Sequence, residues 1–568
     1  MTVETTAPEP PDSRARSASA VVGVAILLSR LSGLIRSAVF GAFMGVGATS
    51  DAFVNATRIP NVLQNLLGEG SLSASFIPVY SAELEHDEEE AGRIAGAVAT
   101  LIALTAAIIV VLGTVFASQI AWLVMLGDTD RPTFGLTVTL LRVIFPSVGL
   151  LVLSAWCLGI LNSHRQFFLS YIAPVVWNIA QIAAVFAAAV FFGVGSTDGL
   201  SADVLSQADD VDVLGDVARV AAWGFLAGSA LQFLIQVPNV LKLVKGLKFR
   251  LDTKRTGVRE VIRRFGGAVA GRGVIQLSAF ADIILANAIA LGAVTALTTA
   301  QTLYIMPISV FAISVAASEL PEISRINEPE DIRRRSEKGF GQIAFFVSFV
   351  ALAYILLGDK IVGAIFERGE FNSDDTLLVW FVLGTYSLGL VPSALSRLTQ
   401  NTLWARGDTR GPARVATVRV IIAIGLAAFA MFYFDRFTTT DVRDTFPTLF
   451  DPGERDTTLR FGAMGITLAS SVGAWVEAFL LWRLADKEIP GVSPLRSIKP
   501  LVPALAAATV VALVMRALTD DVWPPLAALL AVGLTGLTYV GTCRLRKVSE
   551  VNLLLVGPLK GFRSDPPD

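Results

Sequence analysis

Two arginines stand inside an apolar run near the N-terminus, where a charged side chain is costly. Arg30 and Arg36 lie in a stretch long enough to span a bilayer, VVGVAILLSRLSGLIRSAVFGAFM. Even low estimates put an arginine at mid-membrane at roughly 2.5–3.5 kcal/mol. This cost indicates a water-filled cavity and an anionic ligand, because a guanidinium can grip a phosphate through two parallel hydrogen bonds. The segment therefore predicts a membrane protein that handles a phosphorylated substrate inside the bilayer.

The spacing of the two arginines constrains how they could share a ligand. Six residues place them about 120° apart around a straight helix, so convergence on one ligand requires a bend. A bend in this helix could occur at Ser29, Ser32 and Gly33. The alternative for Arg36 is that its long side chain reaches a membrane interface, whereas Arg30 lies nearer the middle of the run.

A second polar stripe follows in the next apolar segment. Asp51, Arg58, Asn65 and Glu69 are spaced so that they fall on one side of a single helix. Pro60 interrupts the hydrogen-bond ladder and is expected to kink this helix. Such a stripe faces a cavity or another helix and not lipid. We expect a substrate-facing role, and the alternative is a network that holds helices together.

The second half of the chain carries four further charges in apolar sequence. Arg272 and Asp282 lie in the expected seventh helix, Arg419 in the eleventh and Glu477 in the twelfth. Asp282 could bind a cation such as sodium with backbone carbonyls, or it could pair with a basic side chain. For Arg419 and Glu477 the default expectation is an ion pair between two helices.

Composition excludes most other classes of protein. The chain has 568 residues, of which 53% are hydrophobic and 17% charged, against about 25% charged in soluble proteins. The net charge of −2 identifies no partner. The only cysteines, Cys157 and Cys543, and the only histidines, His86 and His164, are too scattered for a metal site or a catalytic triad. Neither a Walker A motif nor another cofactor signature is present, so transport energy must come from an ion gradient, the membrane potential or the substrate gradient.

The apolar runs predict an all-α polytopic membrane protein with about fourteen transmembrane helices. A weak internal repeat at an offset of about 245 residues relates Pro60 to Pro307 and LeuAsnSerHisArg at 161–165 to LeuTrpAlaArgGly at 403–407. It predicts two pseudo-symmetric six-helix lobes followed by two C-terminal helices. The expected segments are a disordered tail at 1–17, an N-lobe at 18–243, a basic linker at 244–256, a C-lobe at 257–487, helices thirteen and fourteen at 488–548, and a second tail at 549–568.

The charges of the connectors predict the orientation in the membrane. The connector 194–216 is rich in aspartate and contains no lysine or arginine, whereas 242–264 contains nine basic residues. Because basic connectors stay on the cytoplasmic side, we expect the acidic connector outside and both termini inside.

Several motifs together resemble one known family. The stretch 29–85 carries SR-x-x-G-x-x-R, DAF, PN-x-L and GEG-x-x-x-x-x-F-x-P in that order, and QLSAFAD (276–282), ASELPEISR (317–325), FERGEF (366–371) and RGDTRGP (406–412) follow. In this combination and order, the chain resembles the MurJ/MviN lipid II flippases over nearly its whole length.

The resemblance implies a fold, a substrate and a set of residues. The fold is that of the multidrug/oligosaccharidyl-lipid/polysaccharide exporter superfamily, and the substrate is lipid II, the undecaprenyl-pyrophosphate-linked peptidoglycan precursor. Arg30, Arg36 and Asp51 match cavity-lining charges of the family, Arg58 matches a frequently basic position, and Asp282 matches an acidic position linked in some members to sodium. Helices thirteen and fourteen would form a groove for the lipid tail.

This sequence departs from the family at three places. Many relatives have an acidic–basic pair where this chain has Gln301 and Thr302. Relatives often have a basic pair at the positions of Gln64 and Asn65, and asparagines that are common in the eleventh helix are missing. We therefore hypothesise that Arg272 or Arg419 supplies a third positive contact to the pyrophosphate.

The sequence thus predicts a flippase of the bacterial plasma membrane that carries lipid II outward by alternating access for cell-wall synthesis, without enzymatic chemistry. The pyrophosphate would bind Arg30 and Arg36 in a central cavity between the lobes. One alternative is a drug or organic-cation antiporter, or a polysaccharide-lipid flippase, of the same superfamily. The arginine pair argues against the antiporter, which would favour carboxylates. The other alternative is a non-transporting scaffold for cell-wall synthesis enzymes.

Overall fold

The protein is helical throughout the part of the chain that can be described. A computed structural model describes residues 13–192, 210–326, 328–408, 410–445, 459–520 and 522–556. Within these ranges the regular structure consists of helices, and two isolated β-bridges form no sheet. Eleven helices are long and apolar enough to cross a membrane, or twelve if the bent pair α15 (Ser373–Ser387) and α16 (Leu390–Ala405) is one span. The class of the fold is confirmed, and the count of fourteen spans stays a prediction.

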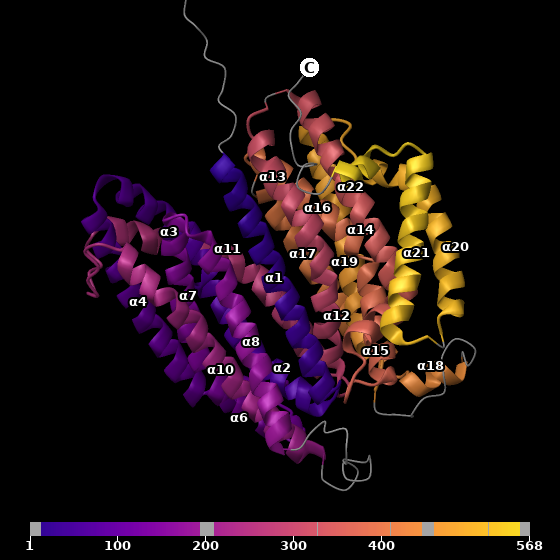
Figure 1. Cartoon of the computed structure of the whole chain (residues 1–568), viewed down its shortest axis with the longest axis horizontal. Helices are drawn as coiled ribbons and strands as arrows, with labels where there is room; N and C mark the ends of the chain where they lie inside the picture. Colours follow the sequence, from indigo (N-terminus) through magenta and orange to yellow (C-terminus); the bar gives the residue numbers. More distant parts are fainter. Residues whose placement is uncertain are drawn as a thin grey trace, which may run out of the picture. The chain divides into compact units, whose positions relative to one another are not determined.

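The helices divide into two compact units, and the first contains most of the N-terminal half. It comprises Met1–Met44 and Ala48–Phe280. Its helices are α1 (Ser13–Met44), α2 (Ala48–Leu67), α3 (Glu69–His86), α4 (Glu88–Val115), α5 (Ala117–Val124), α6 (Thr133–Ile144), α7 (Pro146–Ser163), α8 (Phe167–Phe192), α10 (Asp210–Leu243) and most of α11 (Thr256–Asn287). Within it α7 packs against both α4 and α10 (Figure 1).

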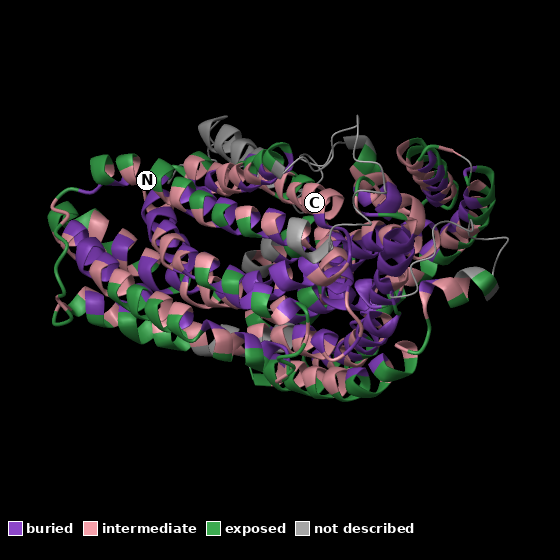
Figure 2. Ribbon diagram, turned by 90° about the horizontal axis from the view of Figure 1, so that it is seen from below, coloured by how far each residue is buried: buried purple, intermediate pink, exposed green. Residues whose placement is uncertain are grey.

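The second unit comprises Gly45–Gly47 and Ala281–Asp568. It contains α12 (Ala293–Pro307), a π-helical turn η1 (Ile308–Ala312), α13 (Ile313–Ile323), α14 (Pro329–Phe366), α15, α16, α17 (Arg410–Phe434), α18 (Thr439–Thr445), α19 (Gly462–Glu488), η2 (Pro494–Leu501), α20 (Val502–Leu518), α21 (Pro524–Leu545), η3 (Ser549–Val551) and α22 (Asn552–Val556). Along many of the helices, buried residues alternate with exposed ones, so one face of such a helix is buried and the other is exposed (Figure 2).

The observed boundaries differ from the expected segments at three points. Helix α1 begins at Ser13, inside the segment expected to be a tail, and residues 1–12 lie outside the described part. The first unit runs to Phe280 and so takes the first part of α11, because Val258 and Val261 are buried in a core cluster of that unit. At the other end, Val551 is buried against the C-terminal helices, although it falls in the expected second tail.

The repeat has a counterpart in the local structure at the ends of two helices. After α7, Gln166 N donates to Leu161 O at 2.8 Å, and Arg165 has a positive φ of 58°. After α16, Asp408 N donates to Leu403 O at 3.0 Å, and Gly407 has a φ of 87°. Both are the left-handed turn that satisfies the last carbonyls of a helix. The motifs related by the sequence repeat therefore form the same helix ending.

The second helix of each half is interrupted. In the first unit α2 runs continuously through Pro60 and ends at Leu67, and α3 starts after Gly68. A Cβ at position 68 would lie 2.4 Å from Gln64 O, so the turn requires glycine. In the second unit the π-helical turn Ile308–Ala312 separates α12 from α13. The single helix expected to carry the stripe from Asp51 to Glu69 is therefore wrong, because Glu69 lies beyond the break.

The C-terminal helices α20 and α21 pack on α14, which is itself irregular. Leu357 departs from helical geometry, with φ −122° and ψ 16°, inside α14. Arg516 of α20 donates to the carbonyl of Leu356 at 3.0 Å and to Asp359 at 3.3 Å. Its guanidinium also lies 4.3 Å from the ring of Trp380. Arg516 thus satisfies a carbonyl beside the irregular turn and pairs with a half-buried carboxylate.

Candidate functional site

Arg36 rests on a platform built by two other helices of the first unit. Its guanidinium lies 5.0 Å from the centre of the Trp177 ring of α8. The indole Nε1 of Trp177 donates to Phe225 O of α10 at 3.3 Å. A Cβ at Gly228 would come within 2.9 Å of Trp177, so glycine allows α10 to approach this ring closely. The stacked face of the guanidinium contacts an aromatic ring, and its N–H edges stay available for an anion.

A polar contact one turn earlier joins the same two helices. Asn178 Nδ2 donates to Ser32 Oγ at 2.9 Å. Ser32 and Arg36 are four residues apart, so one face of α1 packs on consecutive residues of α8. Neither Trp177 nor Asn178 was predicted from the sequence. Asn178 is a polar residue in an apolar run, which was an available signal, whereas a tryptophan in such a run carries none.

Arg30 does not lie on this face. Helix α1 is continuous from Ser13 to Met44, and the hydroxyl of Ser32, which was expected to weaken it, donates to Ser29 O of the same helix at 2.9 Å. Arg30 is exposed, whereas Arg36 is half-buried. The bend that would bring both guanidiniums together is absent from the described α1. Among the residues that the structure describes, neither arginine has a hydrogen-bonding or ion-pairing partner, so both keep their donors for a ligand or water.

The polar residues of α2 divide by burial. Asp51 and Asn55 are 4% and 1% exposed, and Arg58 is half-buried. Asn55 was missed in the sequence, although it lies four residues after Asp51 and three before Arg58 on the same face. Asn65 is exposed, and the side chain of Glu69 lies outside the described residues. The polar surface of α2 is therefore concentrated in its first three turns.

The second unit contains a buried ion pair. Arg419 Nη1 of α17 lies 2.5 Å from Glu477 Oε2 of α19, and Glu477 is 3% exposed. The other carboxylate oxygen of Glu477 accepts a hydrogen bond from Gln400 Nε2 of α16 at 3.0 Å. This is the ion pair between helices that we expected by default. It weakens the hypothesis that Arg419 is the third contact to an anion, because its charge is already compensated.

Two stacked tyrosines adjoin this pair. The rings of Tyr304 and Tyr386 lie 3.9 Å apart and nearly parallel, and Tyr304 donates to Ser393 Oγ at 2.9 Å. Asp282 and Arg419 both act electrostatically on Tyr386. Asp282 therefore belongs to the same polar neighbourhood as the ion pair, and its role as a sodium ligand stays a prediction. Among the described residues no group of three acidic, histidine or cysteine side chains could hold a metal ion. The side chain of Arg272 lies outside the described residues.

Comparison with known proteins gives one consistent result. The family model described as "Lipid II flippase MurJ" matches residues 40–439. A Rhizobium meliloti protein named "Probable lipid II flippase MurJ" is 30% identical over 478 residues, which cover 82% of this chain and 79% of the relative. A Burkholderia cenocepacia protein named "Lipid II flippase MurJ" is 27% identical over 467 residues, covering 80% and 81% of the two chains.

Solved structures agree at the level of the fold. One described as "Lipid II flippase MurJ, inward closed conformation" matches with a TM-score of 0.70 and 22% identity, and the match covers 92% of this chain and 99% of that one. A multidrug transporter of the MATE family matches with a TM-score of 0.64 and 15% identity, over 84% and 98% of the two chains. Both likenesses show the fold alone. The family model covers more than half of the sequence, and the chain therefore belongs to the MurJ family of lipid II flippases.

Proposed function

We propose that this protein moves lipid II from the cytoplasmic to the outer leaflet of the plasma membrane by alternating access, for cell-wall synthesis. Membership of the MurJ family supports lipid II as the substrate. The two arginines of α1 support the way in which lipid II would bind. Arg30 and Arg36 lie in a membrane-spanning helix, and neither has a polar partner among the described residues. Two unpaired guanidiniums in this position suit a pyrophosphate, whose oxygens accept two N–H bonds from each arginine.

In this proposal the named residues bind the substrate or line its path, and none of them carries out a chemical step. Arg36, oriented by Trp177, would bind the pyrophosphate. Because α1 is continuous, Arg30 lies on another side of the helix and would contact the pyrophosphate at a different stage of its passage. Asp51, Asn55 and Arg58 would line the path along α2. Binding to cell-wall synthesis enzymes and a lipid-tail groove on α20 and α21 stay predictions.

The function is tested by replacement of an essential lipid II flippase in cells depleted of their own. We expect the intact chain to restore growth and the labelling of lipid II at the outer surface. A protein that reaches the membrane at normal amounts but restores neither would contradict the proposal. Growth restored without outward movement of lipid II in vesicles would favour the scaffold alternative.

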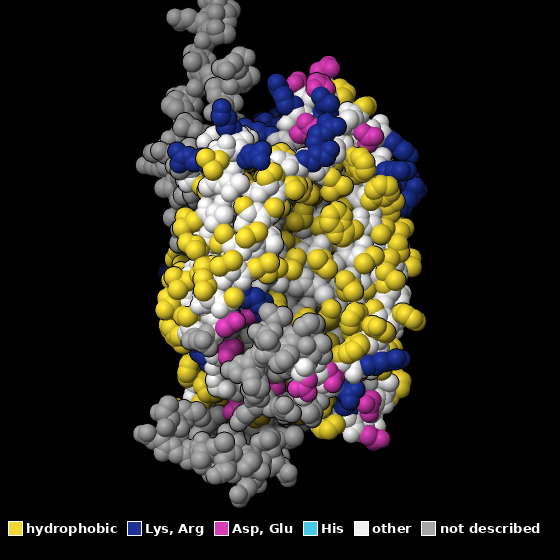
Figure 3. Space-filling model, turned by 90° about the vertical axis from the view of Figure 1, so that its right-hand side faces the viewer, with side chains coloured by type: hydrophobic (Ala, Val, Ile, Leu, Met, Phe, Trp, Pro, Cys, Tyr) yellow, Lys and Arg dark blue, Asp and Glu magenta, His cyan; other side chains and the backbone are white. Residues whose placement is uncertain are grey.

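We propose that both termini face the cytoplasm. The charges on the outer face of the second unit support this orientation: a broad apolar band separates an end rich in lysine and arginine from one where acids and bases mix (Figure 3). The basic end includes the start of α14 and the turn η2, where Arg496 approaches Glu337 at 4.0 Å. Basic residues favour the cytoplasmic side.

Cysteine labelling of two connectors checks this orientation. We expect Ser201→Cys to react with an impermeant maleimide in intact cells and Lys254→Cys to react only after permeabilisation. The native Cys157 and Cys543 are buried, so their background labelling is low. Reaction of Lys254→Cys in intact cells would reverse the orientation.

A further inference from the structure

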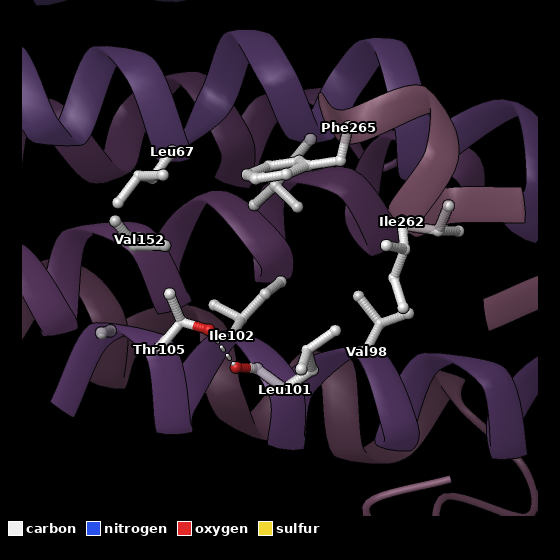
Figure 4. A pocket seen from close by; sticks show the side chains of 11 residues that line it. Leu67, Val98, Leu101, Ile102, Thr105, Val152, Ile262 and Phe265 are labelled. Carbon is white, nitrogen blue, oxygen red and sulfur yellow. Dashed lines mark hydrogen bonds between the residues drawn. The ribbon is translucent and has the colours of Figure 1, made fainter. Parts of the chain in front are cut away.

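The first unit contains an apolar cavity that the proposed transport mechanism does not use. It has a volume of about 150 Å³ and lies beside the break between α2 and α3. Leu67 and Leu72 line it on either side of that break, and α4, α7 and α11 supply the other walls (Figure 4).

The lining offers nothing that would hold water. Thr105 is its single polar side chain, and its hydroxyl already donates to Leu101 O of its own helix at 2.9 Å. A cavity without polar partners stays empty of water and binds apolar groups. Thr105 and Ile262 are both exposed, so the cavity can be reached from the outer surface of the unit. In a bilayer, the apolar groups at such a surface are lipid chains.

Two exposed basic residues lie on or against the helices that form this opening. Arg259 is exposed and lies one turn before Ile262 on α11. The linker that precedes α11 packs on α4, where a Cβ at Gly96 would come within 2.3 Å of Lys248 O. Within the described part of the chain, neither Arg259 nor Lys248 forms an ion pair. Two acids nearby are already compensated, since Glu88 pairs with Lys245, and Glu260 pairs with Arg263 and Arg264.

The linker itself has the composition of a membrane-interface segment. Phe249 and Leu251 are 62% and 58% exposed, although both are large and apolar, and they alternate with Lys248 and Arg250. Exposed apolar residues among cations favour the boundary between headgroups and acyl chains of an anionic leaflet. The cations and the cavity opening therefore lie where one lipid could contact both.

We propose that this region is a binding site for an anionic phospholipid. One acyl chain enters the cavity beside the break between α2 and α3, and the phosphate headgroup binds Lys248 and Arg259. The site is separate from Arg30 and Arg36, and the occupant is a resident membrane lipid and not the transported substrate.

The test is photolabelling of the intact protein in nanodiscs. The probes are phosphatidylglycerol and phosphatidylcholine with a diazirine on the acyl chain, and labelled peptides are located by mass spectrometry. We expect phosphatidylglycerol to label residues 98–106 and 261–265. A cation near an anionic surface favours binding by about fivefold, so phosphatidylcholine should label these peptides at least about fivefold less.

Two pairs of variants separate the cavity from the charges. Thr105→Phe fills the opening from an exposed position and should remove the labelling, whereas Leu104→Phe, exposed on the same helix outside the cavity, should not. Lys248→Gln with Arg259→Gln should abolish the preference for phosphatidylglycerol. Arg334→Gln, another exposed arginine, should preserve it.

Three results would overturn the proposal. The first is equal labelling by the two lipids in the unchanged protein, which would show a chain site without charge selectivity. The second is undiminished labelling of Thr105→Phe. The third is displacement of phosphatidylglycerol by a polyprenyl pyrophosphate at equal concentration, which would assign the cavity to the substrate's tail.

Discussion

Replacing Arg36 by alanine is expected to abolish growth in flippase-depleted cells while leaving the amount of protein in the membrane unchanged. A hydrogen bond to a charged group contributes about 1.5–3 kcal/mol, so loss of a bidentate contact should weaken binding of the pyrophosphate by about a hundredfold or more. Lysine should restore activity in part, because it keeps the charge but lacks the planar fork. The same loss is expected for Arg30→Ala.

Trp177→Leu provides the matched variant for this prediction. It preserves every charge and removes the ring beneath the guanidinium of Arg36. We expect weaker binding of lipid II but measurable transport, since Arg36 remains present and loses only its fixed orientation. Arg334→Ala, an exposed arginine of the second unit, should be fully active. Normal growth of Arg36→Ala at normal abundance would remove this residue from the proposed site.

Removing one member of the Arg419–Glu477 pair is expected to produce the largest loss of stability. Breaking a buried ion pair from one side costs about 3–5 kcal/mol, because the remaining charge is left without compensation. Glu477→Ala also deprives Gln400 of its acceptor. The double variant Arg419→Met/Glu477→Leu should recover most of the stability, since apolar side chains of similar size can replace a buried pair. Thermal unfolding of the purified proteins in detergent measures both effects.

Transport by the stable double variant then decides what Arg419 does. If the pair only joins α17 to α19, the double variant should be both stable and active. If Arg419 also contacts the pyrophosphate, the double variant should be stable but inactive, and adding Thr302→Arg should restore transport. Equal stability of Glu477→Ala and the unchanged protein would contradict the structural role of the pair.

The charged residues of the candidate site and of the buried ion pair could be predicted from the sequence, because each is a charged side chain within an apolar run. Arg36, Asp51 and Glu477 each lie in such a run, and energetic cost alone marks them. The ion pair of Glu477 was predicted because two lone opposite charges in neighbouring helices have few other partners. The helical class and the repeat follow from patterns of hydropathy and turn residues that need no knowledge of packing.

Other features depend on tertiary contacts that leave weak marks in a single sequence. The role of Trp177 depends on a glycine 51 residues later that makes room for its ring. The sequence predicted a kink at Pro60, because proline is the stronger local signal, but α2 continues through Pro60 and the break lies at Gly68. The seventh helix was assigned wholly to the second lobe, but the burial of Val258 and Val261 ties its start to the first unit.

The contact between Arg516 and α14 bears on the order in which the protein can be completed during synthesis. The ribosome makes Leu356 and Asp359 of α14 about 160 residues before Arg516, so the Leu356 carbonyl and Asp359 enter the bilayer before their partner exists. An unsatisfied backbone group in hydrocarbon costs several kcal/mol. The second unit is therefore incomplete until α20 inserts, and a nascent chain halted before that point would expose a polar defect that membrane quality control can recognise.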